Sequence, residues 1–162
     1  MEATFPVVRV AFATVDMKPR VLAIAARIDF TDYDLLPLSV KFVDPFEDRE
    51  LPAGELLTRL PRRDPAVPPE HLLLAKQGLI PALPLIQAYG NEPGFLCVPG
   101  VREYHANPAH TGDPWELRRA KGEGKLFHIL ETIWRYGASQ IFQFQMQVTS
   151  FQFTFQQREI PE

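Results

Sequence analysis

The chain has very little cysteine: Cys97 is the only thiol among its 162 residues. A single cysteine cannot form a disulfide within the chain, so the cysteine content does not indicate an oxidising compartment. No stretch approaches the roughly 18 consecutive apolar residues of a membrane-spanning helix. The first six residues, Met-Glu-Ala-Thr-Phe-Pro, carry no basic region ahead of an apolar run. We therefore expect no membrane span and no secretion signal, and the cytoplasm is the default location.

Several motifs of catalysis and ligand binding are missing as well. The chain has no Gly-x-Ser-x-Gly elbow, and Gly122 and Gly124 do not have the spacing of a phosphate-binding Walker loop. No pair of carboxylates has the pattern of a hydrolase. The formal charge is −3 at pH 7, from 17 basic and 20 acidic residues. This balance argues against a protein that binds nucleic acid or an acidic membrane through bulk charge.

What is present predicts one α+β domain over residues 1–162. With 46% hydrophobic and 23% charged residues, the chain has the composition of a soluble globular protein, and its length allows a core of its own. Apolar residues alternate over 8–12, and further β-rich runs follow at 21–30 and 38–42. We expect an antiparallel meander in which the first two runs pair as a hairpin.

A helix is predicted over residues 126–136, packed on this sheet and closed by Gly137. Its apolar residues recur at helical spacing, and we expect all of them to be in the core. They are Leu126, Phe127, Leu130, Ile133 and Trp134.

Three weaker patterns lie elsewhere. Residues 70–77 are typical of a short helix that begins after a proline and ends before a glycine. Residues 142–155 alternate glutamine with apolar residues, as in a strand with a bulge near 149–150. Arg59, Arg62 and Arg63 form a basic group in a proline-rich loop, which is either plain surface or a docking site for an acidic partner.

The residues around Cys97 carry the chemistry of the chain. Cysteine, histidine and carboxylate are zinc ligands, and Cys97, Glu103, His105 and His110 would complete a four-ligand site. On an extended strand Glu103 and His105 would point to the same side. A turn at 106–109 would bring the rings of His105 and His110 together. The segment lacks the paired cysteines of a zinc finger.

Two other uses of Cys97 are open on the residues alone. The irregular backbone expected at Pro99 and Gly100 would leave the sulfur accessible as a nucleophile, with His105 or His110 stabilising the thiolate. Alternatively, Cys97 is a small buried hydrophobe, because its immediate neighbours are apolar.

The order of elements resembles the ubiquitin-conjugating enzyme superfamily. Three β-rich runs and a bend at 33–37 precede the cysteine, and Trp115 and an amphipathic helix follow it. The segment 34–43 is similar to the proline-bearing approach to the third strand of that family, and 95–98 is similar to its active-site cysteine segment. The resemblance covers roughly residues 7–137. In addition, the set Cys97, Glu103, His105 and His110 is similar to the cysteine–glutamate–histidine–histidine signature of a predicted metal-binding family in bacterial ubiquitin-like conjugation operons, which are implicated in antiphage defence.

This resemblance implies a ubiquitin-conjugating-like fold and a transferase. Cys97 would receive a ubiquitin-like protein as a thioester from a ubiquitin-activating-type enzyme and pass it to an amine of a protein target, without a cofactor. Asn91 or a backbone N–H would stabilise the oxyanion, with Tyr89-Gly90-Asn91 in place of the His-Pro-Asn triplet of that family. His105 and Glu103 would handle protons.

Two non-enzymatic functions compete with the transferase. One is a zinc-binding accessory protein that uses Cys97, Glu103, His105 and His110 as ligands. The other is a plain interaction domain that docks partners through its basic loop.

Overall fold

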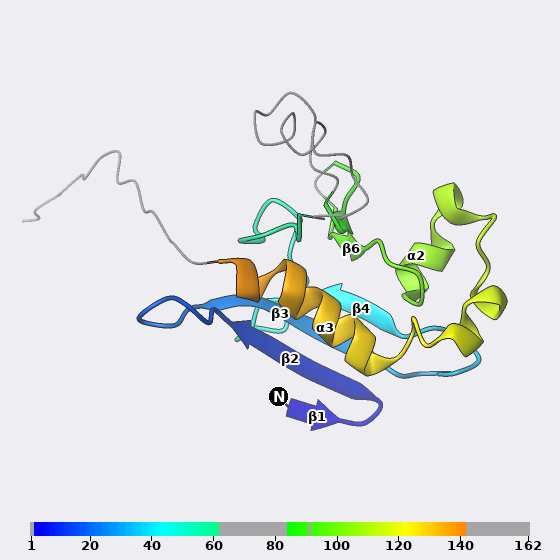
Figure 1. The fold of residues 1–162 in the computed structure, drawn as a ribbon, viewed down its shortest axis with the longest axis horizontal. Coiled ribbons are helices and arrows are strands. Elements are labelled where there is room, and N and C mark those ends of the chain that lie inside the picture. The colour runs from blue at the N-terminus through cyan, green and yellow to red at the C-terminus, as the bar shows by residue number, and fades with distance from the viewer. Residues whose placement is uncertain (1, 62–83, 91, 142–162) are drawn as a thin grey trace, which may run out of the picture.

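The computed structural model describes residues 2–61, 84–90 and 92–141. Within them an antiparallel sheet packs against helix α3 (Leu126–Tyr136), which confirms the predicted α+β class (Figure 1). The helix predicted at 70–77, the strand predicted at 142–155, Asn91, Arg62 and Arg63 lie outside the described residues. Among the helices described, none has the length and apolar character needed to cross a membrane.

The sheet has six strands in the order β1-β2-β3-β4-β6-β5. They are β1 (Glu2–Thr4), β2 (Val7–Ala13), β3 (Leu22–Asp29), β4 (Ser39–Phe42), β5 (Ile86–Gln87) and β6 (Phe95–Leu96). The predicted hairpin is confirmed, because β2 and β3 pair antiparallel, with Val7 opposite Asp29. The third predicted run becomes β4, which pairs with β3. The strands β1, β5 and β6 are two or three residues long, which is too short to show an alternating pattern.

The core lies between one face of this meander and α3. Alternate residues of β3 and β4 point into it, as the period of two requires, and α3 contributes two isoleucines. All of these side chains are at most 5% exposed, and burying one such aliphatic side chain stabilises the fold by about 1.5–3 kcal/mol. They are Ile24, Ala26, Ile28, Val40, Phe42, Ile129 and Ile133.

The bounds predicted for α3 are confirmed, but two of its predicted core residues are wrong. Phe127 is 76% exposed and Trp134 is 44% exposed. The sheet covers the narrower stripe that runs through Ile129 and Ile133, with Leu126 and Leu130 packed beside it. Phe127 and Trp134 lie about 120–140° around the helix from the middle of that stripe and therefore face outward.

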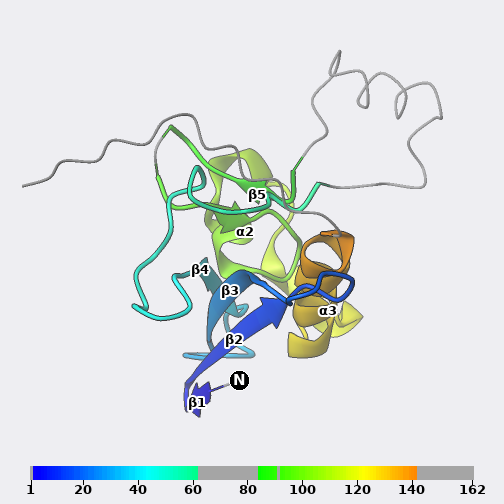
Figure 2. The same cartoon turned by 90° about the vertical axis from the view of Figure 1, so that its left-hand side faces the viewer.

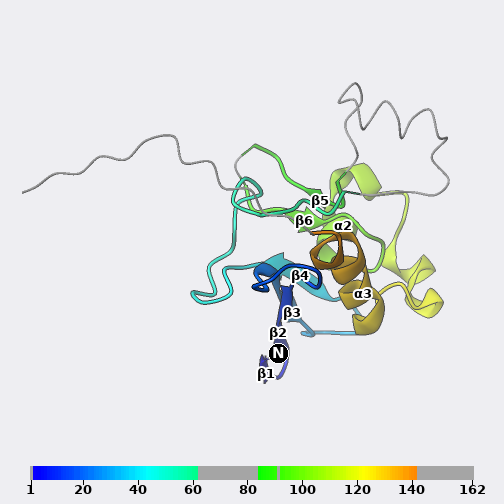
Figure 3. The same ribbon diagram turned by 60° about the vertical axis from the view of Figure 1, so that its left-hand side comes forward.

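Between β6 and α3 the chain folds into short helices. They are α2 (Arg102–Ala106) and the 3-10 turns η1 (Pro108–His110), η2 (Trp115–Leu117) and η3 (Arg119–Lys121), and a further turn, η4 (Ala138–Gln140), follows α3. Views from two other directions place β5, β6 and α2 together on the side of the sheet beyond β4 (Figures 2 and 3).

Trp115 anchors this segment in the core. Its side chain is 6% exposed, and its Nε1–H donates to the carbonyl oxygen of Asp34 at 3.1 Å. Gly124 makes room for the indole, because a Cβ at this position would lie 2.4 Å from Cη2 of Trp115.

The two faces of α3 give a direct test of this packing. We expect Ile133→Ala to lower the free energy of unfolding by about 2–4 kcal/mol, because it removes buried atoms and leaves a cavity. Phe127→Ala, the matched change on the outer face, is expected to alter it by less than about 0.5 kcal/mol. Urea denaturation followed by circular dichroism measures both, and equal losses would contradict the position of the core.

Candidate functional site

Cys97 follows β6 directly, and its sulfur contacts an imidazole. Its backbone N–H donates to the carbonyl oxygen of Leu85 at 2.7 Å. This bond holds Cys97 beside the residue that precedes β5. The side chain is half-buried at the edge of the core. Its Sγ lies 3.3 Å from Nε2 of His110, so a proton can pass between thiol and imidazole.

His110 is held in place by the turn that carries it. Asn107, the N-cap of η1, accepts a hydrogen bond from the N–H of Ala109 at 2.9 Å through its side chain. Its carbonyl accepts from the N–H of His110, also at 2.9 Å. The amide of Asn107 is 7% exposed and donates to the hydroxyl of Tyr89 at 3.1 Å. The turn is thus fastened to the loop that leads toward Cys97.

Tyr104 supports the other side of His110. The two rings are stacked, with centroids 4.0 Å apart and an interplanar angle of 19°. The phenol is 9% exposed, and its hydroxyl donates to Oδ2 of Asp113 at 2.8 Å. Burial, followed by the hydrogen bond to Asp113, raises the pKa of Tyr104 to about 12. The hydroxyl therefore stays protonated at neutral pH and keeps the ring in place.

Asp113 is in turn fixed by Arg118. The guanidinium binds both carboxylate oxygens, with Nε at 2.7 Å from Oδ1 and the second nitrogen at 3.0 Å from Oδ2. These bonds, followed by the one from Tyr104, hold the pKa of Asp113 below its ordinary value. The carboxylate does not cap the following 3-10 turn, because the N-cap of η2 is Pro114. The carboxylate serves Tyr104 and Arg118 instead.

His105 connects the two segments that carry the thiol and its partner. Its Nδ1 lies 2.8 Å from the carbonyl oxygen of Asp113, and its Nε2 lies 3.1 Å from the backbone nitrogen of Gly100. A carbonyl only accepts and a backbone N–H only donates, so the ring is neutral with its proton on Nδ1. His105 thereby sets the spacing between the backbone after Cys97 and the backbone after His110.

Glu103 faces the sheet. One carboxylate oxygen accepts from the hydroxyl of Ser39 at 2.5 Å, and the other accepts from the backbone N–H of Val40 at 3.0 Å. The ammonium of Lys41 lies 3.5 Å from the first of these oxygens. The carboxylate therefore satisfies the backbone N–H of Val40, next to the single residue pair, Lys41 with Phe95, that joins β4 to β6.

Of the predicted site residues, the structure brings Cys97 and His110 together and directs Glu103 and His105 elsewhere. Glu103 and His105 do not point to the same side, because residues 102–106 form the helix α2 instead of a strand, and residues two apart on a helix point about 200° apart. A zinc ion on all four side chains would have to displace the bonds of Glu103 and His105. In the part of the chain that the structure describes, no three or more His, Cys, Asp or Glu side chains are arranged to hold a metal ion.

Three residues that shape the site are not indicated by any motif in the sequence. Tyr104 and Asn107 are a buried phenol and a buried amide within the chemistry-bearing segment itself, and Arg118 lies a few residues beyond it. Their roles depend on contacts across two turns that local spacing does not specify.

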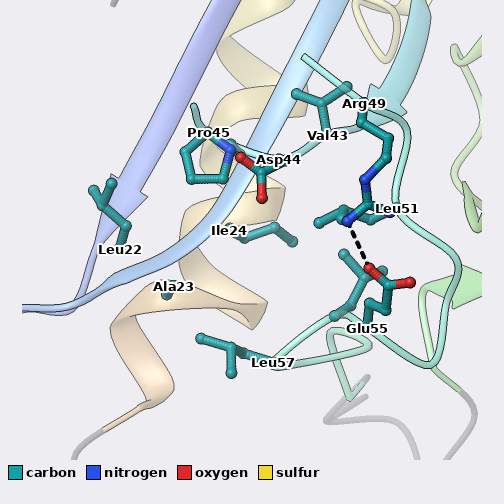
Figure 4. A pocket seen from close by; sticks show the side chains of 12 residues that line it. Leu22, Ala23, Ile24, Val43, Asp44, Pro45, Arg49, Leu51, Glu55 and Leu57 are labelled. Carbon is teal, nitrogen blue, oxygen red and sulfur yellow. Dashed lines mark hydrogen bonds and ion pairs between the residues drawn. The ribbon is translucent and has the colours of Figure 1, made fainter. Parts of the chain in front are cut away.

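A pocket at the start of β3 is made of different residues. It has a volume of about 220 Å³ and apolar walls, and the ion pair of Arg49 and Glu55, 2.8 Å apart, lies at its side (Figure 4). Its apolar lining includes Leu22, Ile24, Val43, Leu51 and Leu57. None of the predicted site residues lines it, so the chemistry of the chain is not directed into this pocket.

The role of His105 can be tested by removal of its ring. We expect His105→Ala to lower the free energy of unfolding by about 1–3 kcal/mol, because it leaves the buried N–H of Gly100 without its acceptor. His128→Ala, on the exposed side of α3, is the control and is expected to change it by less than about 0.5 kcal/mol. Denaturation by urea compares the two variants. A loss for His105→Ala no greater than the control would contradict the proposed link.

The hydroxyl of Tyr104 predicts a pH dependence on the alkaline side. Because its folded pKa of about 12 lies above the unfolded value of 10.0, its contribution is complete below pH 10 and is lost as the pH rises through 12. A shift of this size corresponds to at most about 2–3 kcal/mol. We expect wild type to be more stable than Tyr104→Phe at pH 8 and the difference to shrink at pH 11.5. A difference that does not change with pH would contradict the burial and hydrogen bonding that raise the pKa of Tyr104.

Comparison with known proteins gives two matches. The Y4jH family matches residues 1–141. The uncharacterized protein y4jH of Sinorhizobium fredii (strain NBRC 101917 / NGR234) is 45% identical over 150 residues, which cover 90% of this chain and 73% of that protein. The match spans the whole described sheet, the Cys97–His110 site and α3. The chain therefore belongs to the Y4jH family.

Proposed function

We propose that the chain is a thiol-dependent acyl transferase of the ubiquitin-conjugating type. In this proposal Cys97 carries a ubiquitin-like protein as a thioester and transfers it to an amine in a bacterial ubiquitin-like, antiphage system. The observation that carries the proposal is the 3.3 Å contact between Sγ of Cys97 and Nε2 of His110. A neighbouring imidazole can take the thiol proton and so provide the thiolate, which is the nucleophilic form.

The proposed reaction needs no external oxidant or cofactor. Nε2 of His110 accepts the proton of Sγ, and the sulfur attacks the acyl carbon of an incoming thioester. The carbon–sulfur bond forms while the electron pair of the carbonyl moves to its oxygen. When the tetrahedral intermediate collapses, the donor thiolate leaves and takes up the proton. One thioester replaces another, so the main demands on the protein are position and oxyanion stabilisation.

The arrangement of elements supports the same proposal. An antiparallel meander leads to an irregular segment that bears the cysteine, and Trp115 and then α3 follow it. This is the order on which the resemblance to ubiquitin-conjugating enzymes was based. The proposed partners are a ubiquitin-like protein, a ubiquitin-activating-type enzyme and a protein target. The geometry favours His110 over His105 for the proton, because both nitrogens of His105 are already bonded to backbone groups.

The test uses an activated small thioester of a ubiquitin-like protein as the acyl donor. We expect wild type to form an adduct that dithiothreitol releases, because thiols cleave thioesters. Cys97→Ser is expected to give a slower adduct that resists dithiothreitol, since an oxygen ester replaces the thioester. Cys97→Ala is expected to give none, and His128→Ala is the control that should match wild type.

Two results would overturn the proposal. One is the absence of any adduct on wild type at a donor concentration that loads other thiol transferases. The other is one equivalent of zinc that is retained on dialysis and lost in both His105→Ala and His110→Ala, which would support the accessory protein with four metal ligands instead.

A further inference from the structure

The backbone around Cys97 is already fully engaged. From Cys97 to Val101 every backbone N–H has an acceptor, except at Pro99, which has no N–H. The acceptors are the carbonyl of Leu85 for Cys97 (2.7 Å), the carbonyl of Leu96 for Val98 (2.9 Å), Nε2 of His105 for Gly100 (3.1 Å) and the carbonyl of Val98 for Val101 (3.2 Å). These five residues therefore offer no spare backbone donor for an oxyanion, which is where such donors commonly lie in acyl-transfer sites.

Among the described residues, three polar side chains near Cys97 already donate to other groups. The hydroxyl of Tyr104 donates to Asp113, and the amide of Asn107 donates to the hydroxyl of Tyr89. The ring of His105 donates from Nδ1 to a carbonyl. His110 differs from these side chains, because its Nε2 is directed at the reacting sulfur itself.

We propose that His110 also donates the hydrogen bond that stabilises the oxyanion during acyl transfer to Cys97. This inference rests on the function proposed above and adds the class of electrophile that the site accepts. Once Nε2 has taken the thiol proton, it carries an N–H that points at the sulfur. As the carbon–sulfur bond forms, the negative charge moves from the sulfur to the carbonyl oxygen one atom beyond the carbon. The same N–H then donates to that oxygen, and it returns its proton to the leaving group on collapse.

The surroundings of His110 fix the direction of this donor in advance. Tyr104 covers one face of the ring, and Asp113 and Arg118 hold Tyr104 through a partly buried hydrogen bond and a bidentate ion pair. The backbone N–H of His110 donates to the carbonyl oxygen of Asn107. A donor held in this way needs little reorganisation when charge appears on the oxygen, which is the condition under which such donors are most effective.

The consequence is selectivity for acyl carbonyls. An electrophile that reacts by displacement at a saturated carbon develops no oxyanion, so it benefits from the thiolate but not from the donor. A thioester or an activated ester benefits from both. The site therefore favours acyl donors over alkylating reagents beyond what the reactivity of the thiolate alone provides.

Two reactions of Cys97 separate these effects. Iodoacetamide alkylates the thiolate without an oxyanion, and p-nitrophenyl acetate acylates it through one. We expect His110→Ala to slow both reactions, and to slow acylation by a further factor of about 100, the typical effect of one oxyanion donor. We expect His110→Gln, whose amide nitrogen can occupy the place of Nε2, to recover most of this further factor while alkylation stays slow. Cys97→Ala gives the background rate for each reagent.

Equal slowing of the two reactions in His110→Ala would overturn the inference. So would failure of His110→Gln to recover acylation relative to alkylation, with circular dichroism and the urea midpoint showing that it is folded. Both results depend on the ratio of the acylation rate to the alkylation rate within one variant. A general loss of stability would lower both rates and would not produce the same change in this ratio. A wild-type protein that acylates normally here but forms no adduct with the ubiquitin-like thioester would overturn the proposed function and leave this inference intact.

Discussion

The neutral imidazole of His105 is the contact on which the geometry of the site depends. It joins the backbone N–H of Gly100 to the carbonyl of Asp113, and these lie just after the cysteine and just after its histidine partner. With that distance fixed, Tyr104, Asp113 and Arg118 can hold the ring of His110 beside Sγ. The sequence offered His105 as a possible metal ligand. In the structure it instead links two backbone segments by hydrogen bonds.

The longer strands and the helix α3 could be predicted because each shows its period, whereas the short strands β1, β5 and β6 do not. The hairpin of β2 and β3 and the bounds of α3 follow from alternation and helical spacing. The exposure of Phe127 could not be predicted, because a helix with a broad apolar arc does not reveal which part of that arc the sheet covers. Single helices carry this ambiguity until the partner surface is known.

The site was predicted in composition and only partly in arrangement. The sequence placed a thiol, a carboxylate and two imidazoles within fourteen residues. The residues alone left either His105 or His110 as the thiol partner, and the resemblance assigned the proton to His105 with Glu103. Their separation was decided by α2, a helix of five residues that carries too few turns to show an apolar stripe. Once Glu103 and His105 are on a helix, their side chains cannot share a side, so one binds β4 and the other binds backbone groups of the site loops.

The contact between Gly100 and Gly124 has a consequence for how this region forms. A Cβ on Gly100, whose φ is +92°, would lie 2.5 Å from the backbone nitrogen of Gly124, so the chain closes on itself where neither residue carries a side chain. The side-chain contacts that define the site between Cys97 and Asp113 span only 5 to 13 residues of sequence. Closing such short loops costs little chain entropy, whereas the bonds from Glu103 to β4 span more than 60 residues. Cys97 and His110 can therefore come into contact through closure of a short local loop. The bonds from Glu103 to β4 then fix the position of this loop on the sheet.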